Sequence, residues 1–196
     1  MNYEGAKDYI LKKLQRELDP RLTYHSIAHT LDVLESVIRL AEMEQISDEE
    51  IILLKTACIF HDSGMLVTYR GHEEASIKLC RQTLPSFGYS QEATDRICRM
   101  IRSTKLPQCA DDLLDKILCD ADLDYLGRKD FFMIAHRLKY EWEVLDITKT
   151  TLKEWYKIQK DFLSSHKYFT RSAIKLRQGI KMENLKEVEI MCNHEK

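Results

Sequence analysis

The sequence predicts an all-α protein, and three observations support this fold class. Apolar residues recur at helical spacing along the whole chain, and no run alternates convincingly between apolar and polar over about six residues. The 196 residues include 6 Gly and 3 Pro, which suits long helices better than a sheet protein with many tight turns. The chain shows no internal repeat, low-complexity tract or Gly/Ser linker. We therefore expect residues 1–196 to form one single-domain helical bundle.

The first part of the chain predicts three helices. An apolar stripe over residues 3–18 indicates the first, and Asp19-Pro20 ends it. The second is expected over about residues 26–45. Ser47 is typical of the N-cap in a capping box and opens the third helix. That helix, residues 51–60, is apolar almost all round, so we expect it to be the central and most buried one.

The same spacing predicts six further helices along the rest of the chain. They are expected near residues 71–84, 90–104, 111–125, 129–144, 148–165 and 168–190. Gly179 is a candidate break in the last of them. We expect the helices of about 130–192 to pack on a core formed by about 20–130.

Composition and charge exclude several classes of function. Lys plus Arg is 30 and Asp plus Glu is 32, so a net charge of -2 favours neither nucleic acid nor an anionic membrane as the main partner. No stretch of about 18 uncharged apolar residues is present, and no signal-peptide core follows the polar start. None of the 6 cysteines forms a C-x-x-C pair, which favours reduced thiols. We expect a cytoplasmic protein; the oligomeric state is not predicted.

Ionisable residues stand at the ends of apolar helices, where packing alone does not explain them. His25 and His29 share one helical face, and His61-Asp62 ends the most apolar helix. His72-Glu73 follows Gly71, and Asp120-Ala121-Asp122 ends another apolar stretch. Burying such groups is costly unless they are paired or bind a metal. Imidazole and carboxylate with open positions suit a hydrolytic Mn, Fe, Zn or Mg site better than a closed structural zinc.

These residue types suit phosphate-ester hydrolysis. A divalent ion held by imidazoles and carboxylates lowers the pKa of bound water, which yields a hydroxide near neutral pH. The same ion polarises a phosphoryl oxygen. An imidazole nearby that is not a ligand can protonate the leaving oxygen.

The order H…HD…D in these helical contexts resembles the HD superfamily of metal-dependent phosphohydrolases, over about residues 20–130. The segment Tyr24-His25-x-x-x-His29-x-x-Asp32 is similar to the opening motif of cyclic-nucleotide phosphodiesterases of that superfamily. The resemblance implies a helical bundle of the HD-domain type. It also implies that His25 is the proton donor and general acid, and that the metal ligands are His29, His61, Asp62 and Asp122.

The last ligand is chosen on the family's pattern. Ala121-Asp122-Leu123 matches its A-D-x-L motif, and Asp120 is the alternative. Helical spacing puts the two aspartates on different faces, so we do not expect both to ligate one ion.

The chain also departs from the family's pattern. Many two-metal members carry two more histidines between HD and the last Asp, and His72 fits the first of these. The position of the second histidine falls in Ile101-Arg102-Ser103-Thr104-Lys105, and no histidine occurs between His72 and His136. This implies one metal ion, or a second ion held mostly by water. We expect His72 and Lys105 on the substrate side, with Arg102 as the alternative phosphate contact.

The sequence therefore predicts a metal-dependent phosphohydrolase that cleaves a phosphomonoester or phosphodiester of a nucleotide-like small molecule. The predicted enzyme requires one divalent ion, and the sequence does not distinguish among Mn, Mg, Fe, Zn, Ni and Co. One alternative is a non-catalytic metal-containing module that senses a nucleotide. A less favoured alternative is a di-iron oxygenase, which requires the full histidine set.

Overall fold

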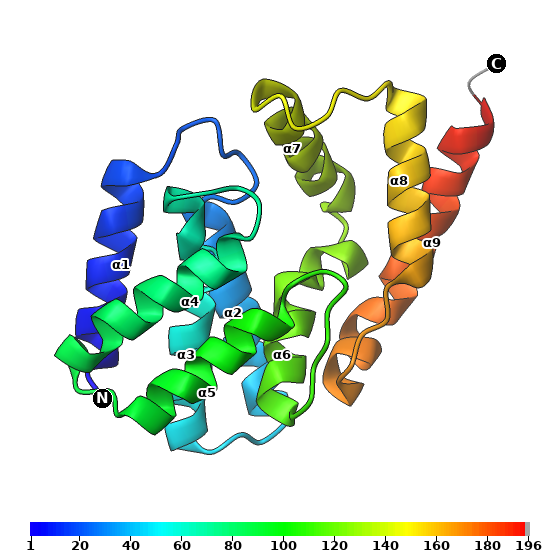
Figure 1. Ribbon diagram of the computed structural model, residues 1–196. Coiled ribbons are helices and arrows are strands. Elements are labelled where there is room, and N and C mark those ends of the chain that lie inside the picture. The colour runs from blue at the N-terminus through cyan, green and yellow to red at the C-terminus, as the bar shows by residue number, and fades with distance from the viewer. Residues whose placement is uncertain (195–196) are drawn as a thin grey trace. The chain divides into compact units, whose positions relative to one another are not determined.

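The computed structural model describes residues 1–194, and every regular element in that range is a helix (Figure 1). The α-helices are α1 (Tyr3–Glu17), α2 (Ile27–Met43), α3 (Asp48–Phe60), α4 (His72–Thr83), α5 (Gln91–Ser103), α6 (Leu113–Asp122), α7 (Phe131–Val144), α8 (Leu152–Ser165) and α9 (Arg171–His194). Short 3-10 helices are η1 (Ser63–Leu66), η2 (Leu84–Phe87) and η3 (Asp124–Gly127). The prediction of an all-α fold is confirmed, and each predicted helix occurs within a few residues of its expected range.

One expectation about the helices is wrong. Gly179 does not interrupt the last helix, because α9 runs without a break from Arg171 to His194. A glycine inside a helix costs only about 1 kcal/mol relative to alanine. The packing of α9 against α8 and η3 outweighs a penalty of that size.

The chain forms two compact units. The first contains residues 1–19 and 25–122, and the second contains residues 20–24 and the chain from Leu123 onward. The packing of residues 130–192 on the motif core stays a prediction. No helix within the described residues has the length and apolar content needed to cross a membrane.

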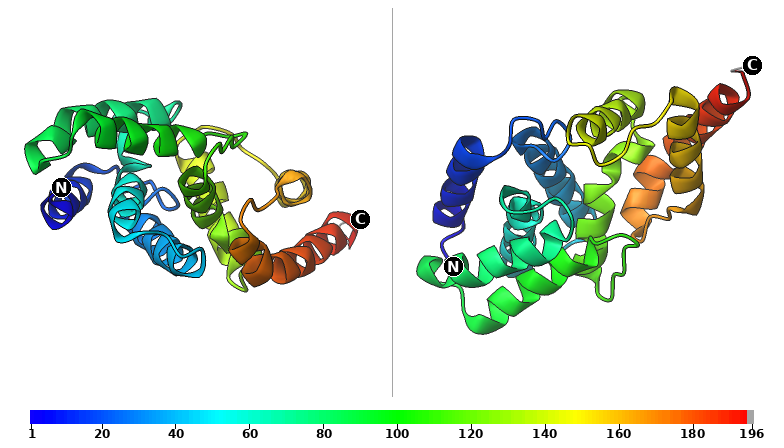
Figure 2. Two further views of the ribbon diagram at one scale, coloured as in Figure 1. Left: turned by 90° about the horizontal axis from the view of Figure 1, so that it is seen from below. Right: turned by 45° about the horizontal axis from the view of Figure 1, so that its top comes forward.

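In the first unit, α3 lies between α1 and α2, and α4 and α5 lie across this layer (Figure 2). The side chains of Leu54, Ala57 and Phe60 on α3 are fully buried, as the all-round apolar sequence of this helix predicts. Ser47 caps the helix: its Oγ accepts the N–H of Glu50 and donates to the carboxylate of the same residue. A buried helix with a defined start therefore delivers its last residues to the interior.

The segment that follows α3 is tied to α4 through one hydroxyl. The Oγ of Ser76 donates to the carbonyl of His61 at 2.7 Å and accepts the N–H of Gly64 at 2.7 Å. At Gly64 the two backbones approach so closely that a Cβ would lie 1.9 Å from the carbonyl oxygen of His72. Only glycine permits this approach, so η1 and α4 together hold the end of α3 in place.

In the second unit, η3 and α7, α8 and α9 share an apolar core around Phe131, Trp155 and Val188. The guanidinium of Arg177 donates to both carboxylate oxygens of Asp124, at 2.7 and 2.9 Å. The amide of Asn184 donates to two carbonyls at the end of η3. These polar contacts fix α9 against η3.

Candidate metal centre

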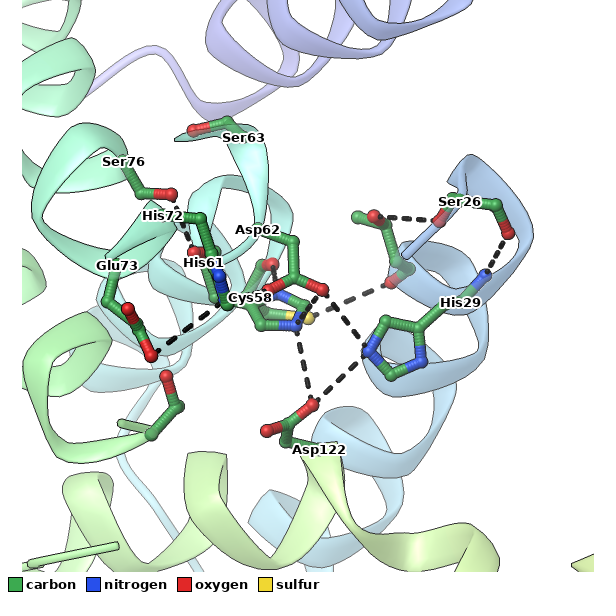
Figure 3. Close-up of polar contacts among 12 residues, drawn as sticks. Ser26, His29, Cys58, His61, Asp62, Ser63, His72, Glu73, Ser76 and Asp122 are labelled. Carbon is green, nitrogen blue, oxygen red and sulfur yellow. Dashed lines mark hydrogen bonds and ion pairs between the residues drawn. The ribbon is translucent and has the colours of Figure 1, made fainter. Parts of the chain in front are cut away.

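Four side chains, from α2, from the residues that follow α3 and from α6, converge in the first unit, as Figure 3 shows. The Nε2 atom of His29 lies 3.4 Å from Oδ2 of Asp62 and 3.2 Å from Oδ1 of Asp122. The Nε2 atom of His61 lies 3.2 Å from the same oxygen of Asp62 and 3.5 Å from that of Asp122. The structure thus brings together the four residues that the sequence analysis assigned as ligands.

Local structure explains why these side chains reach one point. Ser26 is the N-cap of α2, and its Oγ accepts the N–H of His29, which places this histidine in the first turn. His61 and Asp62 follow the buried end of α3, and Asp122 is the last residue of α6. The side chain of His61 is 1% exposed and that of Asp122 is 16% exposed. The cluster is therefore buried on the His61 side and accessible to water on the Asp122 side.

The ring of His61 shows that the cluster suits a cation. Its Nδ1 lies 2.6 Å from the carbonyl of Cys58, and since a carbonyl only accepts, Nδ1 carries the proton. In the neutral ring, the Nε2 lone pair then faces the oxygens of Asp62 and Asp122. In that neutral form, this buried nitrogen receives no hydrogen bond from a donor among the described residues. Electron-rich atoms held this close repel one another unless a positive charge lies between them.

The spacing of the donor atoms also fits a divalent ion. Metal–ligand distances of about 2.0–2.2 Å with angles near 90–110° put neighbouring ligands about 3.0–3.5 Å apart. The four measured separations lie between 3.2 and 3.5 Å. His29, His61 and Asp122 also form a group whose donor atoms all lie within 4.8 Å of one another. The spacing of these donor atoms therefore suits one ion.

The pKa values in the cluster reflect the same arrangement. Burial lowers the pKa of His61, but the carboxylates of Asp62 and Asp122 outweigh burial and raise it well above its ordinary value. Burial would raise the pKa of Asp62, yet His61 and His72 hold it well below its usual range. For Asp122, burial is again outweighed, and His29 and His61 lower the pKa to about 2. Without a metal, protons supply the positive charge that these carboxylates require.

A second donor group uses the other oxygen of Asp62. His25, Asp62 and His72 offer atoms within 4.8 Å of one another. The Nδ1–H of His72 donates to the carbonyl of Tyr69 at 3.0 Å, and its Nε2 lies 3.3 Å from Oδ1 of Asp62. Glu73 lies further off, at 3.9 Å from the same nitrogen. His72, expected on the substrate side, thus lies directly against a carboxylate of the candidate metal centre.

The predicted proton donor, His25, belongs to the second donor group and lies beside the first. The ring of His25 is 6.4 Å from that of His29 and 5.4 Å from that of His72, measured between centroids. His25 is not a member of the group formed by His29, His61 and Asp122. It therefore lies next to the first donor group without belonging to it.

Other candidate residues lie elsewhere. Lys105 follows α5 and is exposed, and its electrostatic neighbour is Glu74 on α4. Arg102 donates to both oxygens of Glu74, at 2.9 and 3.1 Å. Among the described residues, no contact joins Lys105 to the cluster, and its substrate role stays a prediction. Asp120 is fully buried in α6 and belongs to neither donor group, so Asp122 is the aspartate that the structure delivers.

Sequence reasoning missed two residues that shape the site. Tyr69 holds His72 through its carbonyl, and Ser76 holds the carbonyl of His61. Backbone contacts of this kind leave no residue pattern in the sequence. Only the short spacing of Tyr69 to His72 could have indicated a local turn.

Comparisons with known proteins agree with this geometry. A family model described as the HD domain matches residues 26–124. A solved structure described as a predicted HD superfamily hydrolase from an uncultured Thermotogales bacterium is similar, with a TM-score of 0.61 and 20% sequence identity. The match covers 96% of this chain and 90% of that one, and at this identity it shows a shared fold. No curated protein matches the sequence. The matched segment spans half of the chain and contains all four converging residues, so this chain belongs to the HD domain family.

Proposed function

We propose that the protein is a metal-dependent phosphohydrolase acting on a small phosphate ester of the nucleotide class in the cytoplasm. The observation that carries the proposal is the buried Nε2 atom of His61, which lies 3.2 Å from a carboxylate oxygen of Asp62 and 3.5 Å from one of Asp122. An acceptor set of this kind is arranged for a cation. The similar Thermotogales protein is described as a predicted hydrolase, which supports the same reaction class.

The ligand residues would be His29, His61, Asp62 and Asp122. When bound there, a divalent ion supplies Lewis-acid chemistry that activates water and polarises a phosphoryl oxygen. The protein orients the ligands. The Cys58 carbonyl fixes the tautomer of His61, so that its Nε2 is directed at the carboxylates of Asp62 and Asp122. The partial exposure of Asp122 leaves a side of the set accessible to water and substrate.

His25 is the proposed general acid. It lies beside the donor group of His29, His61 and Asp122 but outside it, so an ion held by that group would leave its imidazole to act as the proton donor. The group of His25, Asp62 and His72 supports a second ion as a variant of this proposal. In that variant Asp62 and His72 would help to hold the second ion, and His25 would be one of its ligands rather than the general acid.

The test is a panel of nucleotides and cyclic nucleotides with Mn²⁺, Mg²⁺, Zn²⁺, Ni²⁺ and Co²⁺, run beside Asp62→Ala and His25→Ala. We expect Asp62→Ala to lose metal and all turnover. We expect His25→Ala to keep one ion and lose about 10²–10⁴-fold in kcat, the usual contribution of a general acid. If no ester is cleaved above the Asp62→Ala background, the hydrolase proposal is wrong. Nucleotide binding without turnover would then identify a sensor.

A further inference from the structure

We propose that Tyr69 is the positioning residue of this site, holding the imidazoles of His25 and His72 in their working orientations. The inference rests on the proposed function, since it concerns the residue that donates the proton. It assigns a role to a connection between η1 and α4 that carries none of the ligand residues.

The first contact is made by the backbone. The carbonyl of Tyr69 accepts the Nδ1–H of His72 at 3.0 Å. Because a carbonyl cannot donate, this bond fixes the tautomer and leaves Nε2 directed at Asp62, 3.3 Å away. The orientation of His72 therefore depends on where the backbone of Tyr69 lies.

The second contact is made by the ring. The Tyr69 ring meets the ring of His25 edge-to-face, with centroids 5.4 Å apart and an interplanar angle of 84°. This is a favourable geometry for an aromatic pair. His25 also lies 5.4 Å from His72, so its imidazole is held between two rings, and one of them is that of Tyr69. Removing the Tyr69 ring would remove this edge-to-face contact with His25.

The backbone of the connection explains how one residue makes both contacts. Val67 is 80% exposed, and Thr68 and Arg70 are exposed as well, whereas Tyr69 is partly buried. The Thr68 hydroxyl donates to the carbonyl of Arg70, closing a local turn around Tyr69. Gly71 adopts a left-handed φ of 73°, which turns the chain into α4 directly at His72. A surface turn thus directs a single side chain inward, at the proton donor.

The chemistry separates this role from general stability. Proton donation matters most when the leaving oxygen is strongly basic, and it matters little when the leaving group is a stabilised phenolate. Displacement of a catalytic group by about 1 Å can cost about 10²-fold in rate. A positioning residue of His25 should therefore affect esters of poor leaving groups selectively.

The experiment compares Tyr69→Ala and Tyr69→Phe with His25→Ala, each loaded with metal, on a p-nitrophenyl phosphate ester and on a nucleoside phosphate. We expect Tyr69→Ala to lower kcat on the nucleoside ester about 10–100-fold. Its kcat on the p-nitrophenyl ester should change less than about 3-fold. Tyr69→Phe retains the ring and should match the wild type, and Val67→Ala is the control from the same connection. The inference is overturned if Tyr69→Ala loses metal, or if both esters are affected equally.

A second measurement does not depend on turnover. In the zinc-loaded protein, ¹⁵N NMR of the histidine rings reports the orientation and tautomer of His25 and His72. We expect Tyr69→Ala to shift or broaden the His25 signals and Tyr69→Phe to leave them in place. If the wild type cleaves no ester, the proposed function fails while this spectrum still tests the contact. Unchanged His25 signals in Tyr69→Ala would overturn the positioning role in a protein that does cleave esters.

Discussion

Each of the two units buries a polar cluster, and the two clusters are opposite in character. In the second unit, the ammonium of Lys181, a residue only 2% exposed, donates to the carbonyl of His166 and lies 5.6 Å over the ring of Tyr168. This cation contacts a carbonyl and an aromatic ring that the fold itself provides. In the first unit, carboxylates and imidazole nitrogens face one another, and the cation must come from outside. A buried charge alone therefore does not identify a metal site. A cluster in which acceptor atoms face one another without a cation from the protein does.

The histidines of the two clusters show the same contrast. Burial, aided by the charge of Lys181, lowers the pKa of His166 to about 4. In His61 burial acts in the same direction, but two carboxylates reverse the outcome and raise the pKa. His166 is therefore neutral near pH 7, whereas His61 takes up a proton whenever no metal replaces it.

The largest effect we predict is a difference in metal affinity between variants of the two aspartates of α6. Asp122→Asn should weaken metal binding by more than about 100-fold, because it removes a ligand and outer-shell changes alone cost about 10–100-fold. Asp120→Asn is the matched control, since the same substitution falls on a buried carboxylate of the same helix outside the donor groups. Isothermal titration with Mn²⁺ measures both. Equal loss in the two variants would show that Asp122 is not the specific ligand.

The second prediction concerns where the metal stabilises the chain. At a concentration 100 times its Kd, the ion should raise the free energy of unfolding by about 2.7 kcal/mol. Hydrogen exchange should slow around His61 and Asp122 on metal addition. The amides around Lys181 should change less, since that cluster already contains its cation. Equal protection in both regions would mean that the comparison of the two clusters is wrong.

The third prediction is a pH dependence that arises in the second unit. The pKa of His166 is about 4 in the folded state, against about 6.5 in an unfolded chain. The unfolded state therefore binds the extra proton first, and stability falls as pH drops from about 6.5 towards 4. We expect a loss of roughly 1–3 kcal/mol. His166→Gln should remove most of this slope in urea titrations of chelated protein, and an unchanged slope would assign it to other groups.

The same contrast explains what could be predicted from the sequence. The helices follow from apolar spacing, and the four converging residues follow from a motif whose members are each adjacent to a recognisable helix end. Burial of Lys181 could not be predicted, since a lysine in an amphipathic helix is ordinarily assigned to the surface. The sharing of Asp62 between two donor groups depends on side-chain rotation, and the role of Tyr69 depends on a backbone carbonyl. Neither the sharing of Asp62 nor the role of Tyr69 produces a residue pattern that can be recognised in the sequence.

The smallest predicted effect concerns Gly179, which the sequence marks as a break and the structure retains within α9. An added Cβ there meets nothing within 4 Å, whereas at Gly64 beside the metal centre it would meet a backbone oxygen. Gly179→Ala should therefore raise the free energy of unfolding by about 0.5–1 kcal/mol, through helix propensity and a less flexible unfolded chain. Urea denaturation measures the change. Metal affinity should stay at the wild-type value, because the substitution lies in the unit that supplies no ligand. A destabilised variant would show instead that α9 needs flexibility at this position.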